Sequence, residues 1–175
     1  MKEYNVSYKE FEKIISANKE QIERKNVLLL CDYPNTSEAF RYLKDNYNYL
    51  NLKNINVVFT FYDIDLPQYL YTYNGKELKK QMIQGHGDIR NNGVIDIIEA
   101  SDVVISQPEK YHFSLVFEIL YFFNKKFLIL CENLQAKYVC KNNNNVEIEK
   151  NIPIIFKSKS GEEIELKNCR WIKNF

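Results

Sequence analysis

GHGDIRNNGVIDIIEASDVVISQPEKYHFSLVFEILYFFNKKFLILCENLQAKY, residues 85–138, contains two buried-strand patterns and two helix patterns in alternation. Asp102–Ser106 and Phe127–Cys131 are short, continuous apolar runs, which are typical of strands buried on both faces. The apolar spacing predicts helices over Asn92–Ala100 and Phe113–Phe123. Strands that alternate with helices indicate βαβ units, so we expect an α/β fold with a mainly parallel sheet and helices on both faces.

Two segments of this stretch are candidates for a functional site. They are the glycine-rich turn Gly85–Asp88 and the polar loop Ser106–Phe113. Ligands of open α/β sheets bind at loops that follow the carboxyl ends of strands. We therefore expect the function, or the reason for its loss, at these two segments.

The same alternation continues toward the N-terminus. Asn26–Cys31 and Ile55–Tyr62 are predicted strands, separated by a predicted helix over Glu38–Leu50 that Thr36 or Ser37 can cap. A further helix is predicted between Tyr8 and Lys25, with Ser7 as its N-cap and Glu10 as the capping-box partner of Ser7.

Hairpin patterns occupy two other places. Tyr69, Tyr71 and Tyr73 alternate before an Asn-Gly turn, and Pro153–Lys157 and Ile164–Trp171 flank Ser-Lys-Ser-Gly-Glu. The polar run 142–145 is interpreted as a connector. We expect one domain over residues 1–175, with an N-terminal helix in 1–25, a core in 26–138 and a C-terminal β-hairpin in 150–175.

Composition excludes several classes of protein. The chain has 175 residues and a formal net charge of +1, so bulk charge does not suit it to coating nucleic acid. Its four cysteines lie far apart without a close ligand pair, which predicts reduced thiols and no metal site. The charged N-terminus and the absence of a long apolar run favour a cytoplasmic protein without a membrane segment.

Several catalytic motifs are absent from the sequence. There is no GxGxxG after a strand, no Walker A motif and no serine nucleophile elbow. A nicotinamide enzyme, a P-loop nucleotide hydrolase and a serine hydrolase of the α/β type are therefore not expected.

Four segments, in order, resemble the EcoRI-type adenine-specific DNA methyltransferases. VLLLCDYPNTSEAFRYLKDNYNYLNLKNINVVFTFYD is similar to that family's CDxP turn, helix and second strand, and GHGDIRNNGVIDIIEASDVVISQP to its GDFR segment and catalytic strand. FSLVFEILYFFNKKFLILCENLQAKY resembles its FSLF helix and KKFL strand, and CRWIKNF its CWFTNL stretch. The resemblance implies a Rossmann-like methyltransferase core that binds S-adenosylmethionine at the ends of its first strands.

The resemblance also implies cofactor contacts. By position, Cys31, Asp32 and Pro34 would lie near the methionine and ribose of the cofactor, Asp63 would accept from the ribose hydroxyls, and Asp88 would lie near the adenine. Asp32 and Asp63 also suit a plain turn and a strand terminator, so both interpretations stay open.

The catalytic loop departs from the family pattern. The family holds the two protons of the adenine amine with Asn-Pro-Pro-Phe, whose aromatic ring stacks on the flipped base. This chain has Gln107 in place of the Asn, keeps Pro108, and inserts about three residues before Phe113, so that Tyr111 or Phe113 would have to stack. Geometry of that kind tolerates little displacement.

These departures predict a catalytically degenerate domain that acts by binding. Met1–Lys25 lacks a convincing match to the family's N-terminal segment, and the chain stops soon after the CWF-like stretch. The partner is expected to be a protein, a nucleic acid or a nucleotide-like ligand, and a phage or mobile-element protein with an anti-defence role would suit such a domain by analogy.

Two alternatives remain open. One is an active S-adenosylmethionine-dependent methyltransferase with another acceptor, in which Glu109, Tyr111 or His112 performs acid–base chemistry. The other is a single-strand nucleic-acid binder with the alternating tyrosines and Tyr111 as stacking platforms. That second alternative requires Lys79, Lys80 and Arg90 to cluster around the tyrosines.

Overall fold

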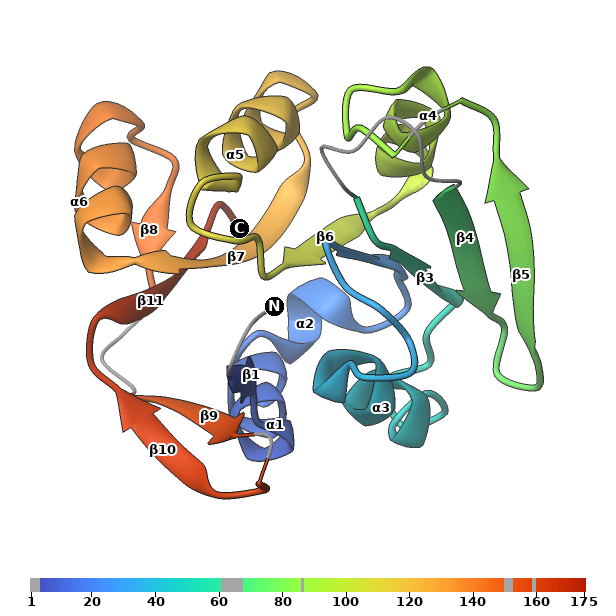
Figure 1. Ribbon diagram of the computed structural model, residues 1–175, viewed down its shortest axis with the longest axis horizontal. Coiled ribbons are helices and arrows are strands. Elements are labelled where there is room, and N and C mark those ends of the chain that lie inside the picture. The colour runs from blue at the N-terminus through green and yellow to red at the C-terminus, as the bar shows by residue number, and fades with distance from the viewer. Residues whose placement is uncertain (1–3, 61–67, 86, 150–152, 159) are drawn as a thin grey trace.

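A computed structural model describes residues 4–60, 68–85, 87–149, 153–158 and 160–175 (Figure 1). Its described strands form one large sheet of eight strands and one small sheet of three. The strands are β1 (Tyr4–Val6), β2 (Asn26–Leu30), β3 (Asn54–Val58), β4 (Gln68–Tyr73), β5 (Leu78–Ile83), β6 (Val103–Ser106), β7 (Lys126–Glu132), β8 (Glu147–Ile148), β9 (Ile154–Ser158), β10 (Glu163–Leu166) and β11 (Cys169–Lys173).

Four parallel strands make the centre of the large sheet, whose order is β5-β4-β3-β2-β6-β7-β11-β8. Here β2 lies between β3 and β6, and β6 pairs with β7. The strands on either side of this centre, β4, β5, β11 and β8, pair antiparallel. The prediction of a mainly parallel sheet is therefore correct only for the centre, because short turns such as the one between β4 and β5 cannot make a parallel crossover.

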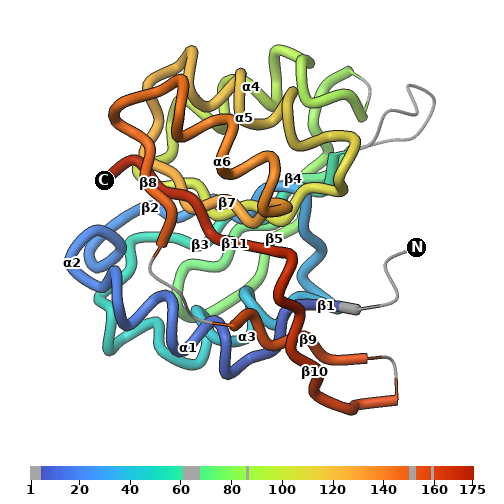
Figure 2. The backbone as a smooth tube through the Cα atoms, turned by 90° about the vertical axis from the view of Figure 1, so that its left-hand side faces the viewer, coloured from blue at the N-terminus to red at the C-terminus, as the bar shows by residue number. Residues whose placement is uncertain are grey.

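Helices cover both faces of the sheet, as Figure 2 shows. One face carries α1 (Tyr8–Ala17), α2 (Lys19–Ile22) and α3 (Glu38–Asp45), and the other carries α4 (Asn92–Ala100), α5 (Phe113–Phe122) and α6 (Asn133–Asn142). Alternate residues of β2 supply the two cores, since side chains of a strand point to opposite faces. Val27 and Leu29 pack with the first helices, and Leu28 and Leu30 pack with the second.

Most predicted elements are present, with shorter bounds. The helix 92–100 has the predicted limits, whereas the helix predicted over 8–25 is divided at Asn18 into α1 and α2. Ser37, and not Thr36, is the N-cap of α3, because its hydroxyl accepts from the backbone N–H of Phe40 at 2.9 Å. Three elements were not predicted: β1, α6 and β8.

The alternating tyrosines form the predicted hairpin arm. β4 pairs antiparallel with β5 across the Asn-Gly turn, where Gly75 has a φ of +89°. The Asn74 side chain accepts from the backbone N–H groups of Lys76 and Glu77, which fixes the turn. All four cysteines are free thiols, as expected. Within the described parts of the chain, each helix is too short or too polar to cross a bilayer.

The C-terminal hairpin is confirmed, but the chain after it differs from the prediction. β9 and β10 pair antiparallel, and β1 pairs with the other edge of β9. The segment predicted as one strand, 164–171, is two strands separated by Lys167 and Asn168, and β11 leaves the hairpin to pair with β7 in the large sheet.

A buried carboxylate joins the N-terminal helix to these last strands. Glu10 is 1% exposed and accepts from Trp171 Nε1 at 3.2 Å and from the backbone N–H of Ile155 at 3.4 Å. Ser7 caps α1 as predicted, through its hydroxyl and the N–H of Glu10. The second half of the predicted capping box is wrong, since the backbone N–H of Ser7 donates to the Ile155 carbonyl at 2.8 Å.

Glu10 should make folding stability depend on pH. Burial raises the pKa of its carboxyl, and hydrogen bonds from Ile155 and Trp171 and the nearby Lys13 ammonium oppose that rise only in part. With a raised pKa, the folded chain binds the proton of this carboxyl more tightly than the unfolded chain does. The resulting stabilisation of the fold is present in full below the unfolded pKa, about 4.3, and is lost as the pH rises through the folded pKa. We therefore expect the difference in free energy of unfolding, parent minus Glu10→Gln, to decrease as the pH rises through this range.

Urea unfolding of the two proteins at a series of pH values measures this difference. The matched control is Glu12→Gln, at an exposed position of the same helix, for which the difference should stay constant. A constant difference for Glu10→Gln as well would contradict the assignment.

Candidate functional site

The carboxyl ends of β2 and β6 lie side by side at the centre of the sheet. Leu30 and Ser106 are register partners, and the Ser106 hydroxyl donates to the Leu30 carbonyl at 2.9 Å. The loops that follow these two strands therefore begin next to each other, at the kind of edge where α/β proteins bind ligands.

The turn after β2 presents a half-buried carboxylate, that of Asp32. Its oxygens accept from the backbone N–H of Tyr33 at 2.8 Å and from the Ser37 hydroxyl at 2.5 Å. Cys31 precedes it with a φ of +63°, and the backbone N–H groups of both residues donate to the Val58 carbonyl. The Gln107 amide of the loop after β6 is a further donor to this carboxylate, at 3.5 Å.

In a second acidic turn, the carboxylate of Asp88 is bound by a side chain of the same protein. The buried carboxylate of Asp88 accepts from the backbone N–H, Nε and Nη2 of Arg90. The amide of Gln68 donates to the Gly87 and Phe59 carbonyls at 3.3 and 3.1 Å and joins this turn to the end of β3. Asp88 therefore supports the turn through Arg90.

The predicted cofactor contacts are thus only partly brought together. Cys31, Asp32 and Pro34 lie in one turn, and Pro34 is buried there. Asp88 belongs to the turn just described, and Asp63 lies outside the described residues. Of these residues, Asp32 lies at the carboxyl end of β2 next to the loop after β6, whereas the carboxylate of Asp88 is bound by Arg90.

Polar contacts hold the loop after β6 in place. Gln107 Nε2 lies 3.5 Å from Asp32 Oδ2, which joins this loop to the turn after β2. Lys110 Nζ pairs with Glu132 at 3.0 Å, and that hydrogen bond raises the pKa of the Lys110 ammonium. Gln135 donates to the Lys110 carbonyl at 3.1 Å and accepts from the backbone N–H of Glu132.

The two aromatic residues of the loop lie in opposite environments. Tyr111 is 86% exposed. Phe113 is 3% exposed at the start of α5, where its ring stacks on Phe117 with centroids 6.0 Å apart. The Phe113 ring is therefore packed in the core, and Tyr111 is the aromatic side chain of the loop that faces solvent.

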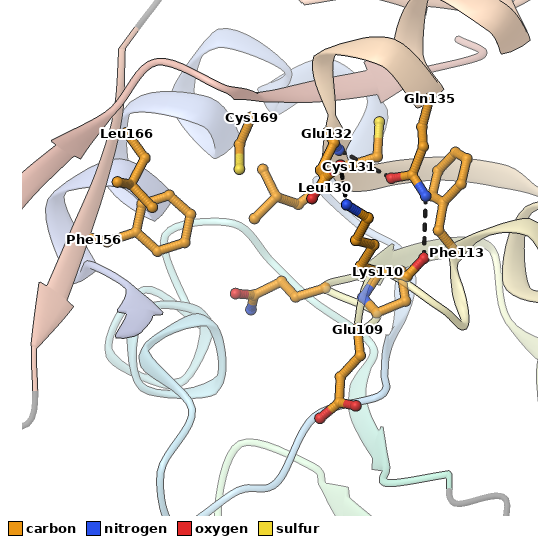
Figure 3. A pocket seen from close by; sticks show the side chains of 12 residues that line it. Glu109, Lys110, Phe113, Leu130, Cys131, Glu132, Gln135, Phe156, Leu166 and Cys169 are labelled. Carbon is orange, nitrogen blue, oxygen red and sulfur yellow. Dashed lines mark hydrogen bonds and ion pairs between the residues drawn. The ribbon is translucent and has the colours of Figure 1, made fainter. Parts of the chain in front are cut away.

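A pocket of about 390 Å3 opens beside this loop (Figure 3). Its lining combines the loop, the ends of β7 and the C-terminal strands: Gln107, Pro108, Glu109, Lys110, Phe113, Leu130, Cys131, Glu132, Gln135, Phe156, Leu166 and Cys169. Burial raises the pKa of both thiols, Cys131 and Cys169, so this part of the wall is uncharged at neutral pH. Concave, mainly apolar sites with a few polar groups are the usual binding sites for small molecules.

Seven of the twelve lining residues lie outside the loop predicted from the sequence. Phe156 and Leu166 come from the β9–β10 hairpin and Cys169 from β11, and the positions of these strands depend on long-range pairing. Glu132 and Gln135 form the capping box of α6, but its first residue is not the Ser or Thr of the usual pattern, so the sequence carries little signal for it.

The tyrosine cluster with its cations is formed only in part. Lys80 Nζ lies 3.7 Å from the ring centroid of Tyr69 and 5.7 Å from that of Tyr71. Lys79 instead pairs with Glu77, and Arg90 with Asp88.

The parallel centre, the acidic turn after β2 and the loop after β6 define an α/β protein with a candidate ligand edge at the end of its central strands. The chain belongs to the family of the adenine-specific methyltransferase EcoRI, whose model matches residues 1–143. It is 26% identical over 129 residues to the Type II methyltransferase M.MgeORF184P of Mycoplasma genitalium, covering 74% of this chain and 40% of that protein. It is 28% identical over 144 residues to the Type II methyltransferase M.EcoRI of Escherichia coli, covering 73% and 44%.

The chain thus matches less than half of the length of each of these curated relatives. The family match ends at residue 143, so β8 to β11 lie outside it. One wall of the pocket, made by Phe156, Leu166 and Cys169, therefore comes from outside the matched residues.

Ser37 holds both Asp32 and the start of α3, which makes it a test of the acidic turn. Ser37→Ala removes the cap of α3 and a donor to Asp32, so the free energy of unfolding should fall by about 1 kcal/mol. The matched control is Thr36→Ala at the exposed neighbouring position, which should change it by less than about 0.5 kcal/mol. Denaturant unfolding measures both, and equal effects would show that the cap is not at Ser37.

Proposed function

We propose that this chain is an EcoRI-type methyltransferase domain that no longer methylates adenine and acts by binding. The parallel centre with helices on both faces supports a Rossmann-like methyltransferase core. The observation that carries the proposal is the loop after β6, where the contacts of Gln107, Lys110 and Phe113 differ from those that an adenine amine requires.

Methylation of an exocyclic amine needs two acceptors and a stacking ring at fixed positions. The amine lone pair is delocalised into the purine ring, so displacement of these groups by about an ångström is enough to lose most of the rate. Gln107 is one methylene longer than the Asn of the family pattern, and its amide nitrogen is turned toward Asp32. Phe113 is packed on Phe117, and Glu109 follows Pro108 where the family has its second proline.

The loop is also anchored in this arrangement. The ion pair with Glu132 and the hydrogen bond from Gln135 hold the side chain and the carbonyl of Lys110 to the start of α6. A change to a loop of the family type would have to break both contacts. These two contacts support the view that the loop has a different stable structure, and not that it is an active loop without its substrate.

S-adenosylmethionine, when bound, would supply a transferable methyl group. Asp32 is the residue whose position suits it, because it follows the carboxyl end of β2, beside the loop after β6. The proposed role is binding of such an adenosyl ligand, or of a protein or nucleic-acid partner, without transfer to adenine. By analogy with small relatives of restriction–modification enzymes, such a domain would suit a phage or mobile-element protein that interferes with host defence.

Thermal unfolding in the presence of S-adenosylmethionine tests the binding role. A ligand at a hundredfold excess over its Kd stabilises the fold by about 2.7 kcal/mol, so a bound cofactor should raise Tm by several degrees. Asp32→Asn should reduce the rise, whereas Asp45→Asn, at an exposed position of α3, should leave it unchanged. An unaltered rise in Asp32→Asn would remove Asp32 from the ligand site.

A transfer assay tests the loss of activity. With isotope-labelled S-adenosylmethionine and DNA, we expect no label in adenine above that given by heat-denatured protein. The M.EcoRI protein serves as the positive control under the same conditions. Label in adenine that depends on the folded chain would overturn the proposal and favour an active enzyme with an atypical loop.

A further inference from the structure

The pocket beside the loop after β6 is built in part by strands that follow the residues matched by the family model. Lys110 and Phe113 lie on one side, and Phe156, Leu166 and Cys169 lie on the other (Figure 3). A ligand of this pocket therefore has to be identified from the chemistry of its own lining.

The walls suit an apolar ligand body. Leu130, Phe156 and Leu166 are apolar, and Phe113 adds a second aromatic ring. The thiols of Cys131 and Cys169 are neutral. An aryl or alkyl group is the chemistry that such walls bind, because its transfer from water is favourable.

A carboxylate and its counter-ion lie at one end of these walls. Glu132 is the N-cap of α6, held in a capping box with Gln135, and its side chain is 33% exposed. Lys110 is 58% exposed and reaches Glu132 with its ammonium at 3.0 Å. The carboxylate is therefore the anchored member of the pair, and the lysine, on a flexible four-carbon stem, is the member that can move into solvent.

We propose that this pocket binds a small organic cation, a primary amine on an aryl or alkyl body, whose ammonium replaces that of Lys110 on Glu132. The Glu132 carboxylate in the lining favours a cation over an anion, since opposite charges attract. Glu109, at the outer rim and pointing away from the other labelled side chains in Figure 3, adds negative charge near the mouth. Lys110 then acts as a built-in competitor for the site.

This inference rests on the proposed function in one respect: an adenine held by the same loop would compete for the mouth of the pocket. The two can nevertheless fail separately. Transfer of methyl groups to DNA would overturn the proposed function, whereas binding of an amine is measured on the chain alone, without cofactor or DNA.

The probe is 2-phenylethylamine, and its matched neutral analogue is 2-phenylethanol. Calorimetry or ligand-observed NMR at pH 7 should give at least tenfold tighter binding of the amine to the parent chain. Lys110→Met should tighten amine binding severalfold and leave alcohol binding unchanged, because the competitor is removed. Glu132→Gln, which keeps an acceptor for the α6 cap, should abolish the preference for the amine.

Lys137→Met, at an exposed position of α6, is the control for general loss of positive charge and should not change the affinity. Equal binding of amine and alcohol to the parent chain would overturn the proposal, as would an unchanged preference in Glu132→Gln. If Glu132→Gln does not fold, as judged by its thermal transition, the comparison of parent and Lys110→Met decides, and no tightening there also overturns it.

Discussion

Burial of β2 and β6 on both faces is the constraint on which the structure depends. Every residue from Val27 to Leu30 and from Val103 to Ser106 is buried, so neither face of the central sheet can be left to water. Helices before and after these strands pack on the two faces of the sheet. The parallel direction of the strands follows from the helical crossovers between them. Because both strands run the same way, their following loops meet at one edge, and that meeting creates the candidate site.

The C-terminal strands change what this edge can bind. In a bare parallel core, the loop after β6 would face solvent beyond β7. Here β11 pairs with β7, and the neighbouring hairpin brings apolar side chains to the same place. The edge consequently carries two candidate sites of different chemistry: an acidic turn at Asp32 and a mainly apolar pocket with the Lys110–Glu132 pair in its lining.

Local features of the sequence were sufficient to predict the centre of the fold. The apolar runs of β2, β6 and β7 and the spacing of α4 each depend on a few neighbouring residues, and these predictions are confirmed. The edges required distant information, since the pairing of β11 with β7 and the break at Lys167 join segments far apart in the chain. α6 was missed because only Ala136 and Val139 are buried on it, whereas Leu134 and Tyr138 are exposed, which weakens its apolar period.

The contact between Glu10 and Trp171 can form only late in synthesis. The two residues are 161 positions apart. At a translation rate of about 5–20 residues per second, the indole is made roughly 8–30 s after the carboxylate that it binds. During that interval the Glu10 carboxylate lacks both of its donors, the Trp171 indole and the Ile155 N–H, although α3, which packs on the same helix, is already made.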